Sequence, residues 1–147
     1  MDIKLSGYWK ATCRGPNGEV KGKKEGHNVV CDVGKEFLAS FLNSAVAAPS
    51  TFTMQYLAVG SDSTTEAASN TALGTELARS TGTVSYISNQ IYQIKTTFTT
   101  GVAVGDVSEY GLFSSSAAGT ILSRDTEGTI SVGSGDTLEV TAQITIA

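Results

Sequence analysis

The amino-acid sequence predicts an all-β protein, and three observations support that fold class. The chain holds 17 serines, 19 threonines and 16 glycines but only two prolines, and threonine favours strand surfaces while serine and glycine favour turns. Short segments in which apolar and polar residues alternate recur along most of the chain. Helical periodicity is confined to one segment near residues 33–45.

These patterns predict a two-sheet β-sandwich with jelly-roll-like topology, built from roughly seven to nine strands and carrying one short amphipathic α-helix near residues 33–45. A parallel α/β fold is disfavoured because it needs repeated crossover helices. The sequence shows no fixed-period repeat and no long linker. We therefore expect residues 1–147 to form a single β-sandwich domain.

The first predicted element is a strand that leads into a hairpin turn. Its apolar face is made of alternating residues within 3–13, namely Ile3, Leu5, Trp9, Ala11 and Cys13. Asn17 and Gly18 follow, and an Asn-Gly pair between two strands is a strong hairpin signal because both residues accept positive φ. The returning strand, within residues 19–31, begins with lysines that protect a sheet edge from pairing with other chains.

The second predicted element is the helix. Its apolar residues recur at helical spacing, namely Val33, Phe37, Leu38, Phe41 and Leu42. Asp32 precedes them and is suited to cap the helix, because its carboxylate would meet unpaired backbone N–H groups. Pro49 cannot continue a helix, so we expect the helix to end before it.

Strands and loops make up the rest of the prediction. The expected strand segments are residues 54–60, two strands within 81–100, a hairpin of 107–115 with 119–125, and 135–147. In the last of these, the inward residues alternate cleanly: Leu138, Val140, Ala142, Ile144 and Ile146. Residues 61–75 are predicted to form a solvent-exposed loop that Leu73 and Leu77 pin to the sheet.

Charge and hydropathy argue against two kinds of partner. A net charge of −4 and a pI near 4.9 disfavour nucleic-acid binding, which depends on clustered lysines and arginines. No apolar run approaches the roughly 20 residues of a membrane-spanning helix, and the N-terminus lacks a signal-peptide pattern. We therefore expect no nucleic-acid partner, no membrane partner and synthesis in a cytoplasm.

Catalysis is also disfavoured by the sequence. The single histidine, His27, lies in a segment rich in lysine and glycine, so a nucleophile elsewhere has no evident base. The carboxylates that would have to act as a pair are scattered, and nothing in the pattern brings two of them together: Glu109, Asp125, Glu127 and Glu139. The sequence predicts no enzyme and no catalytic residues.

Cofactor and metal binding lack the usual patterns. Residues 61–75 contain no lysine or arginine to hold a phosphate. Cys13 and Cys31 show no metal-ligand spacing, and we expect two free thiols, with a disulfide left open if their strands pair. No cofactor and no metal site are predicted.

Several short motifs follow one another in a distinctive order. Asn28, Val29, Val30 and Gly34 match an N-[LV]-V-x-x-x-G entry to a helix, residues 56–60 match Y-[IL]-A-V-G, residues 71–76 match T-A-L-G-T-E, and residues 109–113 match [ET]-x-G-L-F. This order resembles a layout in virion proteins of tailed bacteriophages, especially small capsid decoration or cement proteins. The resemblance touches nearly all of the chain.

The resemblance implies a virion structural protein of jelly-roll-like form. It would be made in the host cytoplasm, sit on the capsid exterior, bind the major capsid protein, self-associate and stabilise the shell. Similar strings occur in phage tail, baseplate and fibre-associated proteins, so such a component, contacting host surface glycan, is the alternative. A glycan-binding domain unconnected with virions is a third hypothesis, disfavoured because most aromatic residues fall on inward strand positions.

Two polar segments are the candidate capsid contacts. One is the lysine-rich hairpin and the other is the hydroxyl-rich loop, and the residues we single out are Lys21, Lys23, Lys24, Asp62, Thr64, Thr65 and Glu66.

Overall fold

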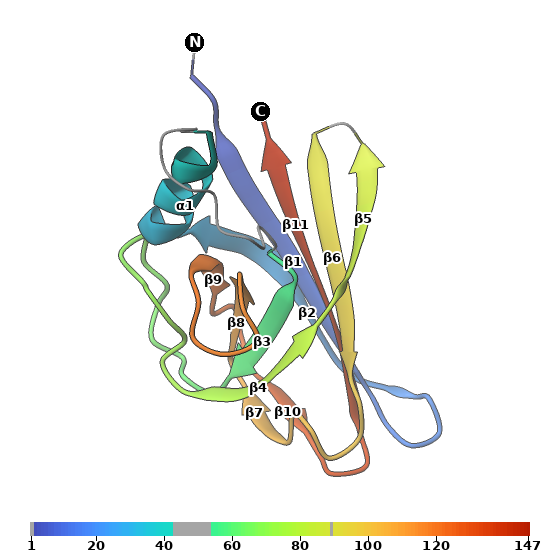
Figure 1. Cartoon of the computed structure of the whole chain (residues 1–147). Helices are drawn as coiled ribbons and strands as arrows, with labels where there is room; N and C mark the ends of the chain where they lie inside the picture. Colours follow the sequence, from blue (N-terminus) through green and yellow to red (C-terminus); the bar gives the residue numbers. More distant parts are fainter. Residues whose placement is uncertain (1, 43–53, 89) are drawn as a thin grey trace.

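The computed structural model describes residues 2–42, 54–88 and 90–147, and antiparallel strands dominate it (Figure 1). The strands are β1 (Leu5–Arg14), β2 (Val20–Val30), β3 (Tyr56–Gly60), β4 (Glu76–Thr81), β5 (Thr83–Ser88), β6 (Ile91–Phe98), β7 (Gly105–Val107), β8 (Glu109–Phe113), β9 (Ile121–Asp125), β10 (Ile130–Val132) and β11 (Thr137–Ile146). One helix, α1 (Asp32–Leu42), follows β2. The all-β prediction with one early helix is confirmed.

Nine strands form one continuous sheet that folds over into two layers. Its order is β4-β3-β8-β9-β2-β1-β11-β6-β5, and β7 and β10 make a separate two-stranded sheet. β2 belongs to both layers, because most of its length pairs with β1 while Val29 and Val30 pair with β9. The sandwich is therefore closed along one side by a shared strand.

The opposite side is closed by the chain itself. β4 and β5 are the two ends of the sheet order, yet only Gly82 separates them in sequence. The Gly82 N–H donates to the Gln55 carbonyl at 2.7 Å, and a Cβ at this position would lie 2.5 Å from Cγ1 of Ile94. A residue without a side chain lets the strand cross between the layers here, and the result is a nearly closed, barrel-like sandwich.

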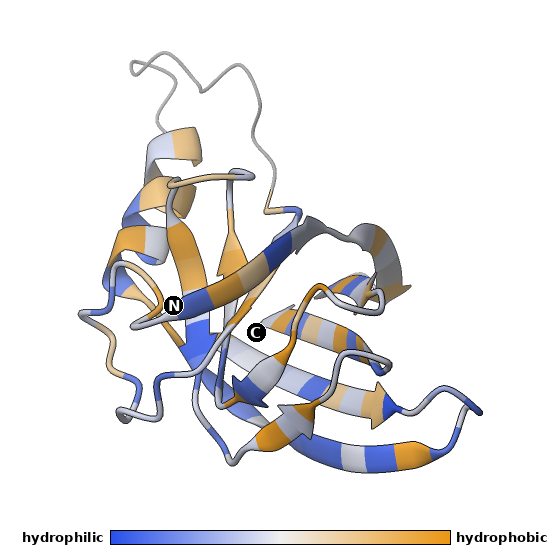
Figure 2. Cartoon of the chain, turned by 90° about the horizontal axis from the view of Figure 1, so that it is seen from below, coloured by the Kyte–Doolittle hydropathy of each residue, from blue (hydrophilic) through white to orange (hydrophobic). Residues whose placement is uncertain are grey.

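The main core lies between the two layers. Trp9 on β1 stacks on Tyr110 of β8 with ring centroids 3.8 Å apart, and Leu57, Phe98 and Leu138 are buried around them. Hydrophobic and hydrophilic residues alternate along the long strands (Figure 2), as expected when one face of each strand packs inward.

A second, smaller apolar cluster lies on the outer face of the β3-β8-β9 layer. It is made of Cys31, Ala58, Leu73, Phe113 and Ile121. Because β8 and β9 carry core residues on their inner face as well, all their residues are buried. Something must cover this outer face, and the covering segment is the loop described below.

Several local predictions need correction. Ile3 and Ile146, expected on inward faces, are 67% and 49% exposed because they lie at the open end of the sheet. Asp32 is the first helical residue rather than the cap, since the Cys31 carbonyl accepts the first helical N–H groups and the Asp32 carboxylate binds Lys35. The predicted helix end at residues 43–45 and the stop at Pro49 lie outside the described residues.

The structure confirms the predicted turn after β1 and contains more strands than predicted. Gly18 adopts a positive φ of 81°, and the Gly15 N–H donates to the Glu19 carbonyl at 2.8 Å, so the Asn-Gly hairpin is confirmed. The strands β4, β7 and β10 bring the count above the predicted range. The three-residue strands β7 and β10 carry too little alternation to be detected, and the six residues of β4 (ELARST) show no alternation of apolar and polar residues along their length.

Candidate functional site

The hydroxyl-rich loop, residues 61–75, is held across the outer face of β3, β8 and β9, and we call it the arm. Leu73 is buried in the outer apolar cluster. At its ends, the Ser61 N–H donates to the Thr75 carbonyl at 2.9 Å, and in its middle the Ala68 carbonyl accepts the Asp32 N–H at 2.8 Å. The prediction of a solvent-exposed loop pinned by Leu73 is confirmed, since most residues of the arm are exposed while Leu73 covers apolar surface that would otherwise face water. Leu77, predicted as the second anchor, is 36% exposed and lies outside the cluster.

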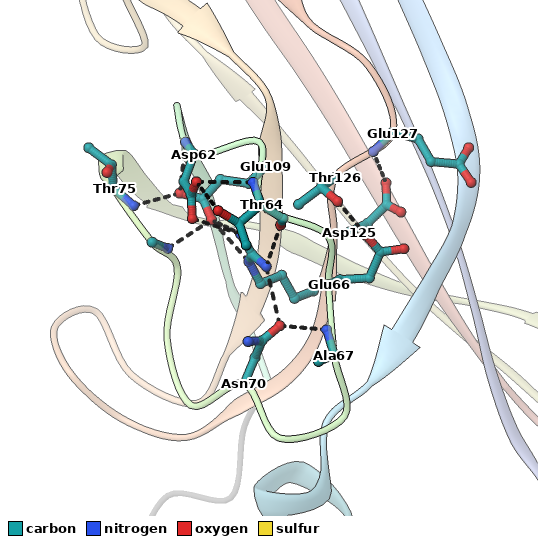
Figure 3. Close-up of polar contacts among 12 residues, drawn as sticks. Asp62, Thr64, Glu66, Ala67, Asn70, Thr75, Glu109, Asp125, Thr126 and Glu127 are labelled. Atoms are coloured by element: carbon teal, nitrogen blue, oxygen red, sulfur yellow. Dashed lines mark hydrogen bonds and ion pairs between the residues drawn. The ribbon is translucent and has the colours of Figure 1, made fainter.

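A buried ion pair on the strands beneath the arm holds it in place (Figure 3). Arg124 on β9 and Glu109 on β8 have side chains only 2% and 0% exposed. Arg124 donates from Nε and Nη2 to one Glu109 carboxylate oxygen, at 3.0 and 2.9 Å. Such a pair is stable in the interior only when further hydrogen bonds satisfy both groups, and the arm supplies those bonds.

Arg124 and Glu109 each bind a different part of the arm. The Arg124 guanidinium donates to the Thr64 carbonyl at 3.0 Å and to Asn70 Oδ1 at 3.2 Å. The Glu109 carboxylate accepts the Gly74 and Thr75 N–H groups at 2.9 and 2.8 Å. Together the two side chains fix both halves of the arm to the sheet.

The arm also carries its own turn-forming bonds. The Asp62 carboxylate accepts the Thr64 N–H at 3.0 Å and the Thr64 hydroxyl at 2.8 Å, and these bonds, with Arg124 at 3.3 Å, hold the pKa of Asp62 below its usual value. Asn70 Oδ1 accepts the Ala67 N–H at 2.8 Å. Polar side chains that bond their own loop backbone give a long loop a defined shape.

The arm continues into the turn after β9. The Thr126 hydroxyl donates to the Glu66 carboxylate (Figure 3), and the Glu127 side chain lies against Gly26 of β2. Glu66 of the arm therefore contacts the turn of residues 126–129, and this turn packs against β2, the strand that carries Lys21, Lys23 and Lys24.

The four arm residues predicted as contacts have different surroundings. Thr64 and Thr65 are exposed, whereas Asp62 and Glu66 are half-buried and use their carboxylates inside the molecule. The threonines are therefore the ones that present side chains outward.

The three predicted lysine contacts do not form one patch. Lys21 binds the buried Asp136 carboxylate at 2.6 Å, and this bond, with the Gly133 N–H, holds the pKa of Asp136 below its usual value. Lys23 and Lys24 are exposed neighbours on β2, and successive strand residues point to opposite faces. Lys23 lies opposite Thr12 of β1, while Lys24 lies against Gly128.

A further surface, which sequence reasoning did not single out, lies at the end of the sandwich where both termini meet (Figure 1). Exposed there are Ile3, Leu42, Ile87 and Ile146, at 67%, 83%, 53% and 49%, and we call this surface the apolar end. The segments of Ile3, Ile87 and Ile146 are adjacent, because the Ile146 N–H donates to the Gln90 carbonyl and the backbone of Lys4 pairs with that of Ala147. Leu42 is the last residue of α1, the helix drawn at the same end in Figure 1.

An apolar pocket opens beside the apolar end. Its volume is ≈ 290 Å³, and Leu5, Leu38, Met54, Val84 and Ile144 are among its lining residues. Clustered exposed apolar residues of this kind mark interaction surfaces.

The groups usually responsible for catalysis are placed as follows. His27 is exposed, and Cys13 and Cys31 are buried free thiols; burial raises the pKa of Cys31 to about 11. Within residues 2–42, 54–88 and 90–147, no three or more His, Cys, Asp or Glu side chains gather as a metal site. In the same ranges, no helix has the length and apolar character to span a bilayer.

The sequence analysis missed the Arg124–Glu109 pair. Its prediction that no two of Glu109, Asp125, Glu127 and Glu139 come together is wrong for Asp125 and Glu127, since the Glu127 carboxylate contributes to raising the pKa of Asp125. Asp62 and Glu109 share Arg124, and Glu66 and Glu127 both flank Asp125. A usable signal was the charge beside apolar strand residues: Glu109 directly precedes Tyr110, Arg124 follows Ile121 and Leu122 after one residue, and an unpaired charge is rarely buried. The absence of lysine and arginine within residues 61–75 concealed that β9 supplies the cation.

Comparisons of the chain with protein-family models, curated proteins and solved structures found no match.

Proposed function

We propose that this protein is a virion structural protein of a tailed bacteriophage, most closely resembling capsid decoration or cement proteins. In this role it binds the major capsid protein on the outside of the shell, associates with further copies of itself and stabilises the lattice. The motif order supports the proposal, and so does one structural observation, the preorganised arm.

The arm suits a contact role because its shape is set before binding. Loops longer than about 12 residues are usually either functional or disordered. Here the buried Arg124–Glu109 pair fixes the loop, so the exposed Thr64 and Thr65 are held in position before any capsid subunit binds. Binding through a preorganised loop avoids much of the entropy cost of ordering it at the interface.

A cement protein must contact more than one neighbour, and the molecule offers two separate surfaces. We assign the arm to the major capsid protein and the apolar end to self-association, because interfaces between identical subunits are the more apolar kind. Each copy then adds a modest contact, and many copies on one particle reinforce the shell.

Purified protein added to expanded, undecorated shells tests the proposal. We expect co-sedimentation with the shells and a higher temperature of shell rupture. The double variant Thr64→Asp, Thr65→Asp should weaken binding, whereas Thr99→Asp, Thr100→Asp, which changes exposed threonines outside the arm, should bind normally. Circular dichroism checks that both variants fold.

Cryo-electron microscopy of intact particles separates the proposal from its alternative. Density for the protein on the capsid exterior supports a cement role. Density confined to the tail, baseplate or fibres, or no binding of the wild-type protein to shells, would contradict the cement role and favour the alternative component.

A further inference from the structure

The interior of the sandwich contains a small cavity where the two layers meet, and its mostly apolar lining includes residues with polar side-chain groups. Its polar lining comes from four strands: Trp9 on β1, Asn28 on β2, Tyr110 on β8, and Ser123 and Asp125 on β9. The space open to the centre of a water molecule is ≈ 10 Å³. A cavity of this size holds about one water molecule.

Four buried polar atoms on this cavity lack hydrogen-bond partners. They are Trp9 Nε1, Asn28 Oδ1, Tyr110 Oη and Asp125 Oδ1, and they are the buried side-chain nitrogen and oxygen atoms without a partner across the described part of the chain. Every one of them belongs to a residue that lines the same cavity. A buried polar group left unpaired destabilises a protein, so four on residues around one cavity point to a common partner.

The strand register explains why these residues meet. Tyr110 and Asp125 are directly opposite each other on β8 and β9, so their side chains share the inner face. Trp9 stacks on Tyr110, and Asn28 Nδ2 donates to the Ser123 hydroxyl at 2.9 Å. That last bond leaves Asn28 Oδ1 as the amide atom available to accept.

The hydrogen-bonding capacities of the four atoms are complementary to one water molecule. An indole N–H only donates and an amide oxygen only accepts, while a tyrosine hydroxyl and a carboxyl group do either. The indole N–H and the tyrosine hydroxyl can therefore act as two donors, and the amide and carboxyl oxygens as two acceptors. A water molecule can accept two hydrogen bonds and donate two, so it can satisfy all four atoms. A metal ion does not match this set, because the indole nitrogen presents a proton and no lone pair.

We propose that this cavity is a binding site for a single buried water molecule, which accepts hydrogen bonds from Trp9 Nε1–H and the Tyr110 hydroxyl and donates to Asn28 Oδ1 and Asp125 Oδ1. The water joins β1 and β2 of one layer to β8 and β9 of the other. It thereby completes the polar contacts inside the sandwich, independently of the arm and of the proposed function.

Water-selective NOE and ROE spectra of the ¹⁵N-labelled protein test the site. Trp9 is the single tryptophan of the chain, so its indole proton gives one unambiguous signal. We expect a cross-peak between this proton and water whose sign marks a long-lived bound molecule. The absence of a cross-peak would overturn the proposal.

Two matched variants distinguish bound water from an exchanging hydroxyl. Tyr110→Phe removes one cavity hydroxyl, and the cross-peak should weaken but persist because three partners remain. Tyr8→Phe removes a hydroxyl bonded to Glu25 on the surface, and the cross-peak should not change. A cross-peak that vanishes in Tyr110→Phe arises from relayed hydroxyl exchange and overturns the proposal.

A high-resolution crystal structure of the wild-type protein gives a second measurement that does not depend on any variant folding. One ordered solvent peak within hydrogen-bonding distance of at least three of the four atoms supports the site. A cavity without solvent density, or with the four atoms paired to one another, contradicts it.

Discussion

The arm and the lysine-bearing part of β2 are both polar segments, yet the structure holds them in different ways. The arm is fixed by a buried ion pair and by a leucine in an apolar cluster. Lys23 and Lys24 are exposed on a strand, and Lys21 makes an ion pair while itself 44% exposed. A polar segment is therefore fixed to the sheet where the strands beneath it supply buried hydrogen-bond partners, whatever its own composition.

Breaking the buried pair should give the largest difference between the two segments. Arg124→Met leaves the Glu109 carboxylate buried without its cation, and removing one partner of a buried pair destabilises a protein by about 3–5 kcal/mol. Urea denaturation measures the change. Arg14→Met, which loses an exposed bond to the Gly18 carbonyl, is the control and should stay close to the wild type. An equal decrease in the free energy of unfolding in Arg124→Met and Arg14→Met would show that the Arg124–Glu109 pair does not anchor the arm.

Removing the apolar anchor of the arm should have the next largest effect. Leu73 is 9% exposed and Leu77 is 36% exposed. Leu73→Ala should lower the free energy of unfolding by about 2–4 kcal/mol, because it opens a cavity in the outer cluster, and Leu77→Ala should lower it by less. Amide hydrogen exchange of residues 61–75 locates the effect. Unchanged protection in Leu73→Ala would mean that the polar bonds suffice to hold the arm.

The pH dependence sharpens the comparison, because Asp125 lies between the two segments. Burial, opposed in part by the Glu127 backbone N–H and supported by the nearby carboxylates of Glu66 and Glu127, raises the pKa of the Asp125 carboxyl to about 7. Tyr110 faces the carboxyl from β8, while β1 and β2 present only the uncharged Trp9 and Asn28 to the cavity.

The folded state therefore keeps a proton on Asp125 that the unfolded state releases near pH 4. The contribution of Asp125 to stability is largest below its unfolded pKa and falls as pH rises toward 7, by up to about 1.4 kcal/mol per pH unit. Asp125→Asn should flatten this slope between pH 5 and 7, measured by denaturation at each pH. Asp106→Asn, at an exposed position, should retain the wild-type slope, and a wild-type protein that is equally stable at pH 5 and pH 7 would contradict the assignment.

The lysine strand should respond least in stability. Lys23 and Lys24 are exposed and screened and contribute little to stability, so replacing Lys21, Lys23 and Lys24 with Ser should lower the free energy of unfolding mainly through the lost bond between Lys21 and the buried Asp136 carboxylate. If this strand docks on an acidic shell, the triple variant should instead lose particle affinity mainly at low salt. Sedimentation with shells at two salt concentrations measures this loss, and unchanged affinity at both removes the strand from the contact surface.

Much of the fold was predictable because it depends on patterns that neighbouring residues carry. The alternation around Trp9, Ala11 and Cys13 predicted β1, and the same argument placed Leu138 and Val140 in the core. The Asn-Gly pair predicted the hairpin since its backbone preference is local. Asp32 was misplaced by one residue because helix boundaries depend on which carbonyl accepts first.

The site was less predictable because its partners are distant in sequence. Residues 61–75 contain no lysine or arginine, and this composition predicted that the loop does not bind an anion. The loop instead binds the guanidinium of Arg124 on β9, which no pattern within residues 61–75 could reveal. The arm and β9 become neighbours only when the sheet folds over. Likewise, no local pattern places the Tyr110 and Asp125 side chains in the same cavity as Trp9 and Asn28.

By itself, the sequence determined the all-β class, the early helix, the first hairpin and most inward-facing strand residues, because each of these depends on periodicity or turn chemistry within a few residues. Only the tertiary structure decided that β2 is shared between layers, that Gly82 closes the sandwich and that Arg124 with Glu109 holds the arm. Those features arise from contacts between residues that are distant in sequence. A buried charge such as Glu109 is stable only when its partner, Arg124, lies beside it, and that requires the strands to be assembled first.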